Sequence, residues 1–284
     1  MAGELDGRVV LVTGATNGIG LVAARELAGM GATTCLVARD RARGEDAIRQ
    51  IREATGNDRL SLFVGDLSSQ AEVRRVAAEV RAATGRLHVL LNNAGAIFTR
   101  RQVSADGIEM TFALNHLGYF LLTRELEPLL VAGAPSRVVN VSSSAHRRAR
   151  MDWEDLFGER AYSSWKAYGQ SKLANILHAR ELSRRMSDRG VAANALHPGA
   201  VATGWGRNNA GLFRLVMQVG APFLLRPVRG ARTSVYLASS PDVEGVTGQY
   251  FEDRRPVRPS HAATSDADAR RLWDLSERLV ADRR

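Results

Sequence analysis

Short apolar runs alternate with longer amphipathic segments along the first two-thirds of the sequence. The apolar runs are rich in Val and Leu and are bounded by Gly or polar residues, which is typical of buried strands. We predict six of these strands, at about Arg8–Val12, Thr33–Val37, Leu60–Val64, His88–Leu91, Arg137–Val141 and Val191–Leu196. The amphipathic segments predict helices at about Gly18–Met30, Asp40–Ala54, Ser69–Thr84, Gly107–Val131, Trp165–Arg189 and Ala267–Arg284.

This alternation predicts the fold class. Strands that are separated by helices pair in parallel and are joined by right-handed crossovers, which place helices on both faces of the sheet. No fixed-period repeat and no linker-like stretch divides the chain. The sequence therefore predicts an α/β fold, a Rossmann-type doubly wound sheet in a single domain that spans residues 1–284.

Composition excludes several classes of protein. The 284 residues are 45% hydrophobic and 24% charged, which is too apolar for a disordered chain. The single cysteine, Cys35, cannot form an internal disulfide, and this favours a reducing, cytoplasmic location. No signal peptide is recognisable, and no apolar run reaches the ~18 residues of a spanning helix, so we expect no integral membrane association.

The chain is basic, with a net charge of +9, but its basic residues are spread over the whole length. This distribution favours a solvated arginine-rich surface over a nucleic-acid-binding patch. Only two of the 39 basic residues are lysines, Lys166 and Lys172. A lysine retained in so arginine-rich a chain draws attention, because arginine cannot exchange a proton near neutral pH and lysine can. Metal binding is not expected, because the six histidines and one cysteine show no metal-ligand spacing.

A glycine-rich turn follows the first predicted strand and opens a helix. Glycines in this position allow a tight turn and let the backbone approach a pyrophosphate, which the helix N-terminus attracts. The context of strand, turn and helix makes dinucleotide binding the favoured interpretation over a purely structural turn. The residues predicted to contact the cofactor here are Gly14, Thr16, Asn17, Gly18, Ile19 and Gly20.

The end of the second strand, Ala38-Arg39-Asp40, should face the adenosine ribose. Asp40 could accept hydrogen bonds from a ribose 2′-hydroxyl, which would favour NAD. Arg39 could pair with a 2′-phosphate, which would favour NADP. We place Ala38 at the strand tip and Asp40 as the cap of the next helix, so that NADP(H) is preferred while NAD(H) stays an alternative.

Further polar and glycine residues follow the third and fourth strands, where ligands bind in open α/β sheets. Asp66 could accept a hydrogen bond from an adenine amino group or could cap the following helix. Gly95 allows the backbone to approach the cofactor closely. The predicted cofactor contacts at these strand ends are Asp66, Leu67, Asn93, Ala94 and Gly95.

Tyr168 and Lys172 form the most specific chemical signal. They are four residues apart on a predicted helix and so share one face. A cation one turn away stabilises a phenolate and brings the tyrosine pKa closer to neutrality, which suits acid–base catalysis. Ser142, Ser143 and Ser144 close the fifth strand at the same edge of the sheet, and any of the three hydroxyls could hold a substrate oxygen beside Tyr168.

Together these motifs resemble the short-chain dehydrogenase/reductase family over nearly the whole chain. The resemblance implies a seven-stranded doubly wound sheet and hydride transfer between NAD(P) and a carbonyl or alcohol. It implies that Tyr168 is the proton donor or acceptor, that Lys172 lowers the tyrosine pKa and binds the nicotinamide ribose, and that Asn115 anchors a proton-relay water. It also implies cofactor contacts at Tyr168, Lys172, Pro198, Gly199, Val201 and Thr203.

More narrowly, the sequence is similar to the retinol dehydrogenase branch, in segments such as Asn140–His146 and Ser171–Leu177. In that branch the catalytic serine precedes the tyrosine by 25 residues, which selects Ser143 here. The branch mostly prefers NADP. Its members commonly carry an N-terminal membrane anchor, whereas this sequence begins at its first predicted strand. We therefore expect a soluble aldehyde or ketone reductase rather than a retinoid enzyme.

A long apolar segment at about residues 204–229 predicts a helical lid that favours an apolar substrate. The same segment could instead pack on the core, on the partner of a homo-oligomer or, less well, on a membrane surface. The expected protein is an NADP-dependent oxidoreductase that interconverts an apolar carbonyl compound and its alcohol. The alternative is a catalytically silent NADP(H)-sensing regulator with the same fold.

Overall fold

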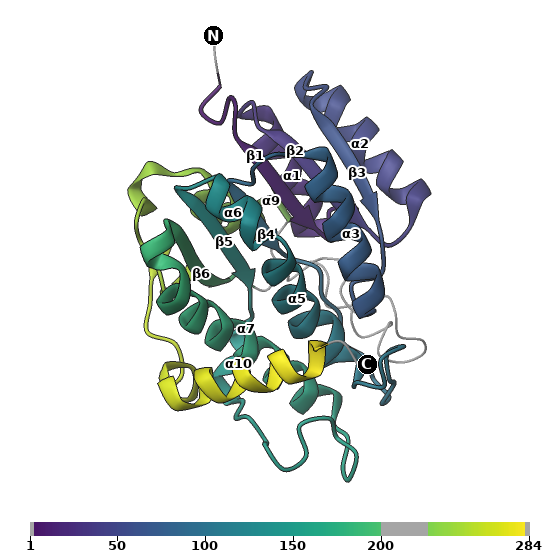
Figure 1. Ribbon diagram of the computed structural model, residues 1–284, viewed down its shortest axis with the longest axis vertical. Coiled ribbons are helices and arrows are strands. Elements are labelled where there is room, and N and C mark those ends of the chain that lie inside the picture. Colours follow the sequence, from purple (N-terminus) through teal and green to yellow (C-terminus); the bar gives the residue numbers. More distant parts are fainter. Residues whose placement is uncertain (1–2, 200–226, 282–284) are drawn as a thin grey trace.

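The computed structural model describes residues 3–199 and 227–281, which form one eight-stranded sheet with helices on both faces (Figure 1). The strands are β1 (Val9–Thr13), β2 (Thr33–Ala38), β3 (Leu60–Val64), β4 (Val89–Asn92), β5 (Ser136–Val141), β6 (Val191–His197), β7 (Tyr250–Glu252) and β8 (Arg255–Pro256). The α-helices are α1 (Gly18–Gly29), α2 (Arg41–Thr55), α3 (Gln70–Ala83), α4 (Met110–Phe112), α5 (Gly118–Glu125), α6 (Glu127–Ala132), α7 (Ser164–Met186), α9 (Pro227–Ser239) and α10 (Asp266–Val280). The α/β prediction is confirmed.

The strand order is β3-β2-β1-β4-β5-β6-β7-β8. The strands from β3 to β7 are parallel, and only β8 runs antiparallel to its neighbour β7. The sheet has one strand more than the seven that the resemblance implied, because the two residues of β8 fold back on β7. The chain reverses its direction of winding between β1 and β4, so a crevice opens at the carboxyl ends of these two strands.

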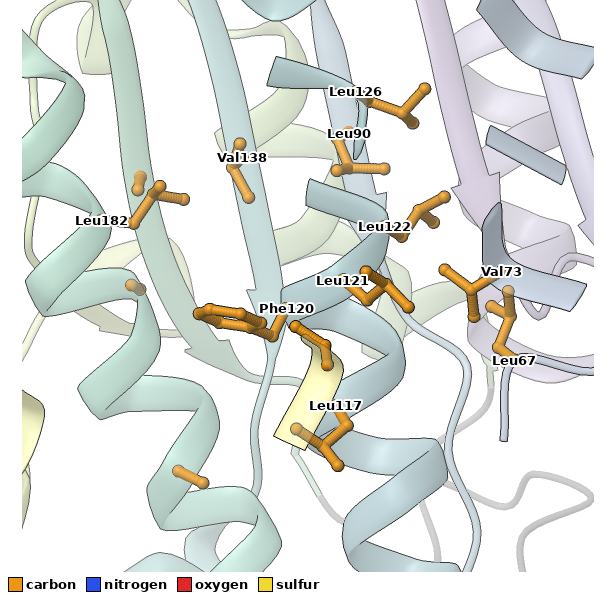
Figure 2. Close-up of a cluster of buried hydrophobic side chains, with 14 of the residues drawn as sticks. Leu67, Val73, Leu90, Leu117, Phe120, Leu121, Leu122, Leu126, Val138 and Leu182 are labelled. Carbon is orange, nitrogen blue, oxygen red and sulfur yellow. The ribbon is translucent and has the colours of Figure 1, made fainter. Parts of the chain in front are cut away.

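Two hydrophobic layers cover the sheet. One layer contains side chains of α1, α2 and α9, which pack on one face. The other contains side chains of α3, α5 and α7, and α10 packs on the outer side of α7 (Figure 1). Figure 2 shows the second layer, in which Leu90 and Val138 from the sheet meet Phe120, Leu121 and Leu122 from α5. Both faces of the sheet are therefore buried, which explains why its strands read as continuous apolar runs.

The predicted helix Gly107–Val131 is wrong as one continuous element. Gly107 adopts a left-handed φ of 76° in a turn before α4. A π-helical segment, Ala113–Leu117, separates α4 from α5. The helix breaks at Leu126 and α6 begins at Glu127, with Pro128 in its first turn, because proline supplies no N–H for a continuing helix. The apolar pattern alone could not show these breaks, since buried residues continue through all of them.

The boundaries of other elements differ little from the predicted ones. The helix predicted at Trp165–Arg189 ends its α-helical part at Met186 and finishes with a 3₁₀ turn, Ser187–Arg189. The helix predicted at Ala267–Arg284 is α10, which ends at Val280. Residues 227–229, expected at the end of the lid, form the first turn of α9 instead. Lid residues 204–226 lie outside the described ranges.

Candidate active site

A cleft of about 1520 Å³ lies along the carboxyl ends of the central strands. Its walls come from the turns that follow β1 to β6 and from the first half of α7. The predicted site residues that line the cleft are Gly14, Thr16, Asn17, Ile19, Gly20, Arg39, Asp66, Leu67, Asn93, Ala94, Gly95, Ser143, Tyr168, Lys172, Pro198 and Gly199. Gly18 and Asn115 do not line it, and Val201 and Thr203 lie outside the described residues.

The glycine-rich turn is shaped so closely that side chains would not fit. Gly14 has a left-handed φ of 65°, and a Cβ on it would lie 2.9 Å from the Cα of Ala94. A Cβ on Gly20 would lie 2.4 Å from the carbonyl oxygen of Gly14. Gly18 also has a left-handed φ, of 54°, and so shapes the turn without lining the cleft.

The first turn of α1 keeps its N–H groups available for a ligand. Asn17 occupies the N-cap position, but its side chain makes no capping hydrogen bond. Backbone N–H groups at a helix N-terminus bind anions through their hydrogens and the helix dipole. This close-packed cradle fits the pyrophosphate of a dinucleotide.

Thr13 and Asn93 join the glycine turn to the end of β4. The Thr13 hydroxyl accepts hydrogen bonds from the backbone N–H groups of Asn93 and Ala94, at 2.8 and 3.0 Å. The Asn93 side chain in turn donates to the carbonyl oxygen of Thr13 at 2.9 Å. Asn93, predicted to contact the cofactor, therefore also holds the two loops of the crevice together.

The loop after β2 combines a capped helix with two arginines. The Asp40 carboxylate accepts a hydrogen bond from the backbone N–H of Arg43 and caps α2, as expected. Arg39 and Arg43 both line the cleft. Arg43 was not expected here, although its place one turn into the helix could have shown that it returns to the ligand side.

Asp66 is held by its own turn. Its carboxylate accepts hydrogen bonds from the backbone N–H and the hydroxyl of Ser68, at 2.9 and 2.8 Å. The cap of α3 is Ser69, so Asp66 orders the turn that leads into that helix rather than capping it directly. Leu67 beside it faces both the cleft and Val73 in the hydrophobic layer (Figure 2).

Tyr168 and Lys172 share one face of α7, as the spacing predicts. Lys172 is 3% exposed, and its Nζ lies 5.7 Å from the centre of the Tyr168 ring. The same nitrogen donates to the carbonyl oxygen of Val141 at 3.0 Å. Burial lowers the pKa of Lys172 to about 7, because the charged form loses its hydration. A lysine in this state can gain and lose a proton near neutral pH.

The structure separates the three adjacent serines. The Ser142 hydroxyl is buried and donates to the carbonyl oxygen of Lys172 at 2.7 Å. Ser144 is exposed, and its backbone N–H donates to Nδ1 of His197. The Ser143 hydroxyl accepts from the N–H of Ala145 at 3.2 Å, which leaves its own hydrogen for a ligand in the cleft. The geometry therefore favours Ser143, the serine chosen from the sequence.

Asn115 lies behind the wall of the cleft, in the π-helical segment. Its Oδ1 accepts from the N–H of Ala96, and its Nδ2 donates to the carbonyl oxygen of Ala96 and to the Ser171 hydroxyl, each at 2.9 Å. A Cβ on Gly95 would lie 3.1 Å from Asn115 Oδ1 and 3.3 Å from Lys172 Nζ. The Asn115 side chain thus clamps the loop after β4 against α7.

His146 is a further residue that the sequence reasoning did not single out. Its Nδ1 donates to the carbonyl oxygen of Ser143 at 2.7 Å, because a carbonyl can only accept. Its Nε2 accepts from the N–H of Ser260 at 3.3 Å, so the imidazole is neutral. Burial lowers the pKa of His146 and keeps it in this form. His146 ties the backbone of Ser143 to the segment after β8.

Two structural findings bear on membranes and metals. Within residues 3–199 and 227–281, no helix combines the length and apolar character needed to cross a membrane. The same residues contain no group of three or more His, Cys, Asp or Glu side chains that could hold a metal ion.

Among known proteins, the chain is similar to short-chain dehydrogenases and to retinol dehydrogenases. Residues 8–210 match the family described as short chain dehydrogenase. Mouse retinol dehydrogenase 14 is 42% identical, with 98% of this chain and 87% of the relative covered. Human retinol dehydrogenase 13 is 40% identical, with 97% of this chain and 85% of the relative covered.

Two solved structures are also similar to this chain over most of its length. An uncharacterized protein from Mycobacterium paratuberculosis is 35% identical with a TM-score of 0.77, and the match covers 97% of this chain and 94% of that one. The active-site complex of Pseudomonas aeruginosa RhlG with NADP is 28% identical with a TM-score of 0.70, and the match covers 87% of this chain and 94% of that one.

Proposed function

The chain belongs to the short-chain dehydrogenase family, and on that premise we propose that it interconverts an apolar aldehyde or ketone and its alcohol with NADP(H), with Tyr168 as the acid and base. The protein is an oxidoreductase of CH–OH and C=O groups, and the family binds NAD(P). The observation that carries the proposal is that Ser143, Tyr168 and Lys172 line the same cleft as the glycine-rich turn after β1.

The reaction is carbonyl + NADPH + H⁺ ⇌ alcohol + NADP⁺. Bound NADPH supplies a hydride to the carbonyl carbon. The Ser143 hydroxyl donates a hydrogen bond to the carbonyl oxygen, where negative charge develops. The Tyr168 hydroxyl gives its proton to the same oxygen, and in the direction of oxidation the phenolate takes this proton back.

Lys172 serves Tyr168 in two ways. Its charged form, 5.7 Å from the ring centre, stabilises the phenolate that remains after proton transfer. Its pKa of about 7 lets it pass a proton on near neutral pH. Asn115 holds the loop after β4 beside Lys172, and we propose that Asn115 also anchors the water that resupplies the proton.

The residues after β2 support a preference for NADP over NAD. Asp40, the carboxylate that could bind a ribose 2′-hydroxyl, is used as the cap of α2. Arg39 and Arg43 line the cleft at this point and offer two guanidinium groups to a 2′-phosphate. The relative RhlG was solved as a complex with NADP, which agrees with this preference.

The test is NADPH oxidation with a panel of aliphatic, aromatic and retinoid aldehydes, with NADH in parallel. We expect turnover with NADPH and a loss of roughly 10²–10⁴-fold in kcat for Tyr168→Phe, with the Kd for NADPH retained. If NADPH binds but no aldehyde, ketone or alcohol reacts, the protein is the silent NADP(H) sensor instead.

The cofactor preference has its own matched pair of variants. Arg39→Ala should raise the Kd for NADPH by roughly ten-fold or more and change the Kd for NADH little, because only NADPH carries the 2′-phosphate. Arg41→Ala removes the same charge two residues away, from a side chain that pairs with Glu45 and does not line the cleft. Equal effects of the two substitutions would refute the assignment of Arg39.

A further inference from the structure

The segment that follows Ser143 brings three arginines to the cleft. Arg147 and Arg148 end the 3₁₀ turn Ser144–Arg148, and Arg150 follows two residues later. All three line the same cleft as Ser143 and Tyr168. Nothing in the proposed reaction of a neutral carbonyl compound requires positive charge at this place.

Among the residues that the structure describes, one of these three arginines has a carboxylate partner. Arg147 pairs with Glu252 at 2.8 Å. The lining carboxylate nearest in sequence, Asp152, pairs with Lys166 at 2.6 Å and also accepts from two backbone N–H groups. Arg148 and Arg150 are exposed, and neither guanidinium group forms a hydrogen bond or ion pair with any residue of 3–199 or 227–281.

The long segment that follows Gly199 adds no acidic residue to the sequence. The sequence from residue 200 to residue 226 contains no Asp or Glu, and its charged residues are Arg207, Arg214 and Arg226. Two positive charges at the edge of a cleft raise the local concentration of anions and favour their binding.

The position of the two arginines places them at the reacting end of the cleft. Ala149 lies between them in sequence, and a Cβ on Gly169 would be 3.2 Å from the Ala149 Cβ. Gly169 directly follows Tyr168 on α7. Arg148 and Arg150 therefore flank a residue that packs against the catalytic helix beside its tyrosine.

The two arginines also follow a different strand from the arginines at the adenosine end. β2, which leads to Arg39, and β5, which leads to this segment, are separated in the sheet by β1 and β4. Three strand spacings of about 4.8 Å place the two strand ends roughly 14 Å apart. Arg39 and Arg43, which follow β2, are therefore the arginines expected to bind a 2′-phosphate at that strand end.

The surroundings of Arg148 and Arg150 are apolar as well as basic. Met151 and Trp165 line the same cleft, and the Trp165 side chain is exposed over 58% of its surface. We propose that Arg148 and Arg150 form an anion subsite that binds a carboxylate or phosphate group on the carbonyl substrate. The preferred substrates are then amphipathic, with an apolar body against Trp165 and a negative charge on the arginines. This inference rests on the proposed function and names the substrate class of that same site.

The test compares ω-oxo fatty acids with their methyl esters over a series of chain lengths. At low ionic strength, we expect kcat/KM for the acid to exceed that for the ester by roughly ten-fold or more, mainly through KM. Added salt should reduce this preference, because it screens exposed charges. The double variant Arg148→Ala/Arg150→Ala should bring kcat/KM for the acid down to that for the ester.

Arg270→Ala is the matched control. Arg270 is an exposed arginine on α10 that does not line the cleft, so its substitution changes the net charge without touching the subsite. An acid preference that is absent from the wild type, or that survives in the double variant, would overturn the subsite. Turnover of the ester that is lost in Tyr168→Phe would at the same time uphold the proposed function.

Two binding measurements test the anion subsite independently of catalysis. Calorimetric titration of the enzyme with α,ω-dicarboxylic acids and their diesters, with NADP⁺ present, should show tighter binding of the acids in the wild type only. Equal binding in wild type and double variant refutes the subsite even if no panel substrate reacts. A ten-fold rise in the Kd for NADPH in the double variant would show that these arginines hold the cofactor instead.

Discussion

Lys172 donates a hydrogen bond from its Nζ to the carbonyl oxygen of Val141, the last residue of β5, at 3.0 Å. The bond fixes the side-chain nitrogen at the strand end that continues into Ser142 and Ser143. It also explains how a lysine is accommodated at 3% exposure: its stem is packed in the core and its head has a polar partner.

Lys172→Met should raise the free energy of unfolding at pH 7 and lower kcat. Burial lowers the pKa of Lys172 from 10.5 to about 7, so the folded protein binds fewer protons here than the unfolded chain between those pH values. The stability conferred by this residue therefore rises with pH from about 7 to about 10, and the full cost of burying its charged form is reached below pH 7. The methionine variant should gain on the order of 4 kcal/mol in free energy of unfolding at pH 7.

Urea denaturation of the cofactor-free protein between pH 7 and pH 10 measures this effect. The variant should show a flatter pH dependence than the wild type, and its kcat should fall roughly 10²–10³-fold. A variant that is less stable than the wild type at every pH would show that Lys172 is not buried as the structure places it.

The three serines should respond differently to replacement by alanine. Ser143→Ala should lower kcat roughly 10²-fold or more, because it removes a donor to the substrate oxygen. Ser142→Ala should cost about 1 kcal/mol of stability, through loss of its hydrogen bond to the Lys172 carbonyl. Ser144→Ala should leave stability close to the wild type. Steady-state kinetics and thermal unfolding of all three decide the assignment, which is wrong if Ser144→Ala has the largest effect on kcat.

Two glycines of α1 provide a matched pair for the cofactor cradle. A Cβ on Gly20 would lie 2.5 Å from Asn93 Nδ2, so Gly20→Ala should cost about 2 kcal/mol and weaken NADPH binding. Gly29 has only an ordinary contact at 3.6 Å, from Thr55, so Gly29→Ala should stabilise the helix by about 0.5 kcal/mol. Calorimetric titration with NADPH and urea denaturation test both, and similar behaviour of the two variants would contradict the packing described for Gly20.

His116 and Ser276 join the π-helical segment to α10. The Ser276 hydroxyl donates to the carbonyl oxygen of Leu272, so it accepts the hydrogen of His116 Nε2 at 2.9 Å. Ser276→Ala leaves this buried N–H without a partner and should cost about 1–3 kcal/mol. Added to His116→Phe, the same serine substitution should cost much less, because the donor is already gone. Additive losses in urea denaturation of this double-mutant cycle would exclude the hydrogen bond as a stabilising contact.

Two buried histidines should make the protein sensitive to acid. Burial lowers the pKa of His178 to about 3 and that of His116 well below its usual range. Below pH 6.5 these two histidines bind protons in the unfolded chain but stay neutral in the folded protein, so the free energy of unfolding falls as the pH falls. At pH 5 the loss in free energy of unfolding that is due to His178 is about 2 kcal/mol. His178→Phe should be less stable at pH 7 but lose stability less steeply between pH 6.5 and pH 4. An unchanged slope would contradict the buried neutral state.

The sequence alone determined the features that depend on neighbouring residues. The alternation of strands and helices, the glycine turn, the cap at Asp40 and the shared face of Tyr168 and Lys172 are local, because helix and strand periods and capping act over a few residues. The parallel, doubly wound sheet also followed from the alternation, since crossover handedness leaves few arrangements, whereas the strand order was read only from the structure. The interruption of the helical pattern at Pro128 is likewise a local feature, because proline lacks the N–H that a continuing helix needs.

The tertiary structure alone decided what depends on burial and on partners distant in the chain. It separated Ser143 from Ser142, because the Ser142 hydroxyl finds its acceptor on α7, 30 residues away. It also set the environment that lowers the pKa of Lys172 and placed Asn115 behind the cleft wall. A sequence records which groups can donate, accept or carry charge. Which of them lose their water, and which partner replaces it, is settled only when distant segments pack together.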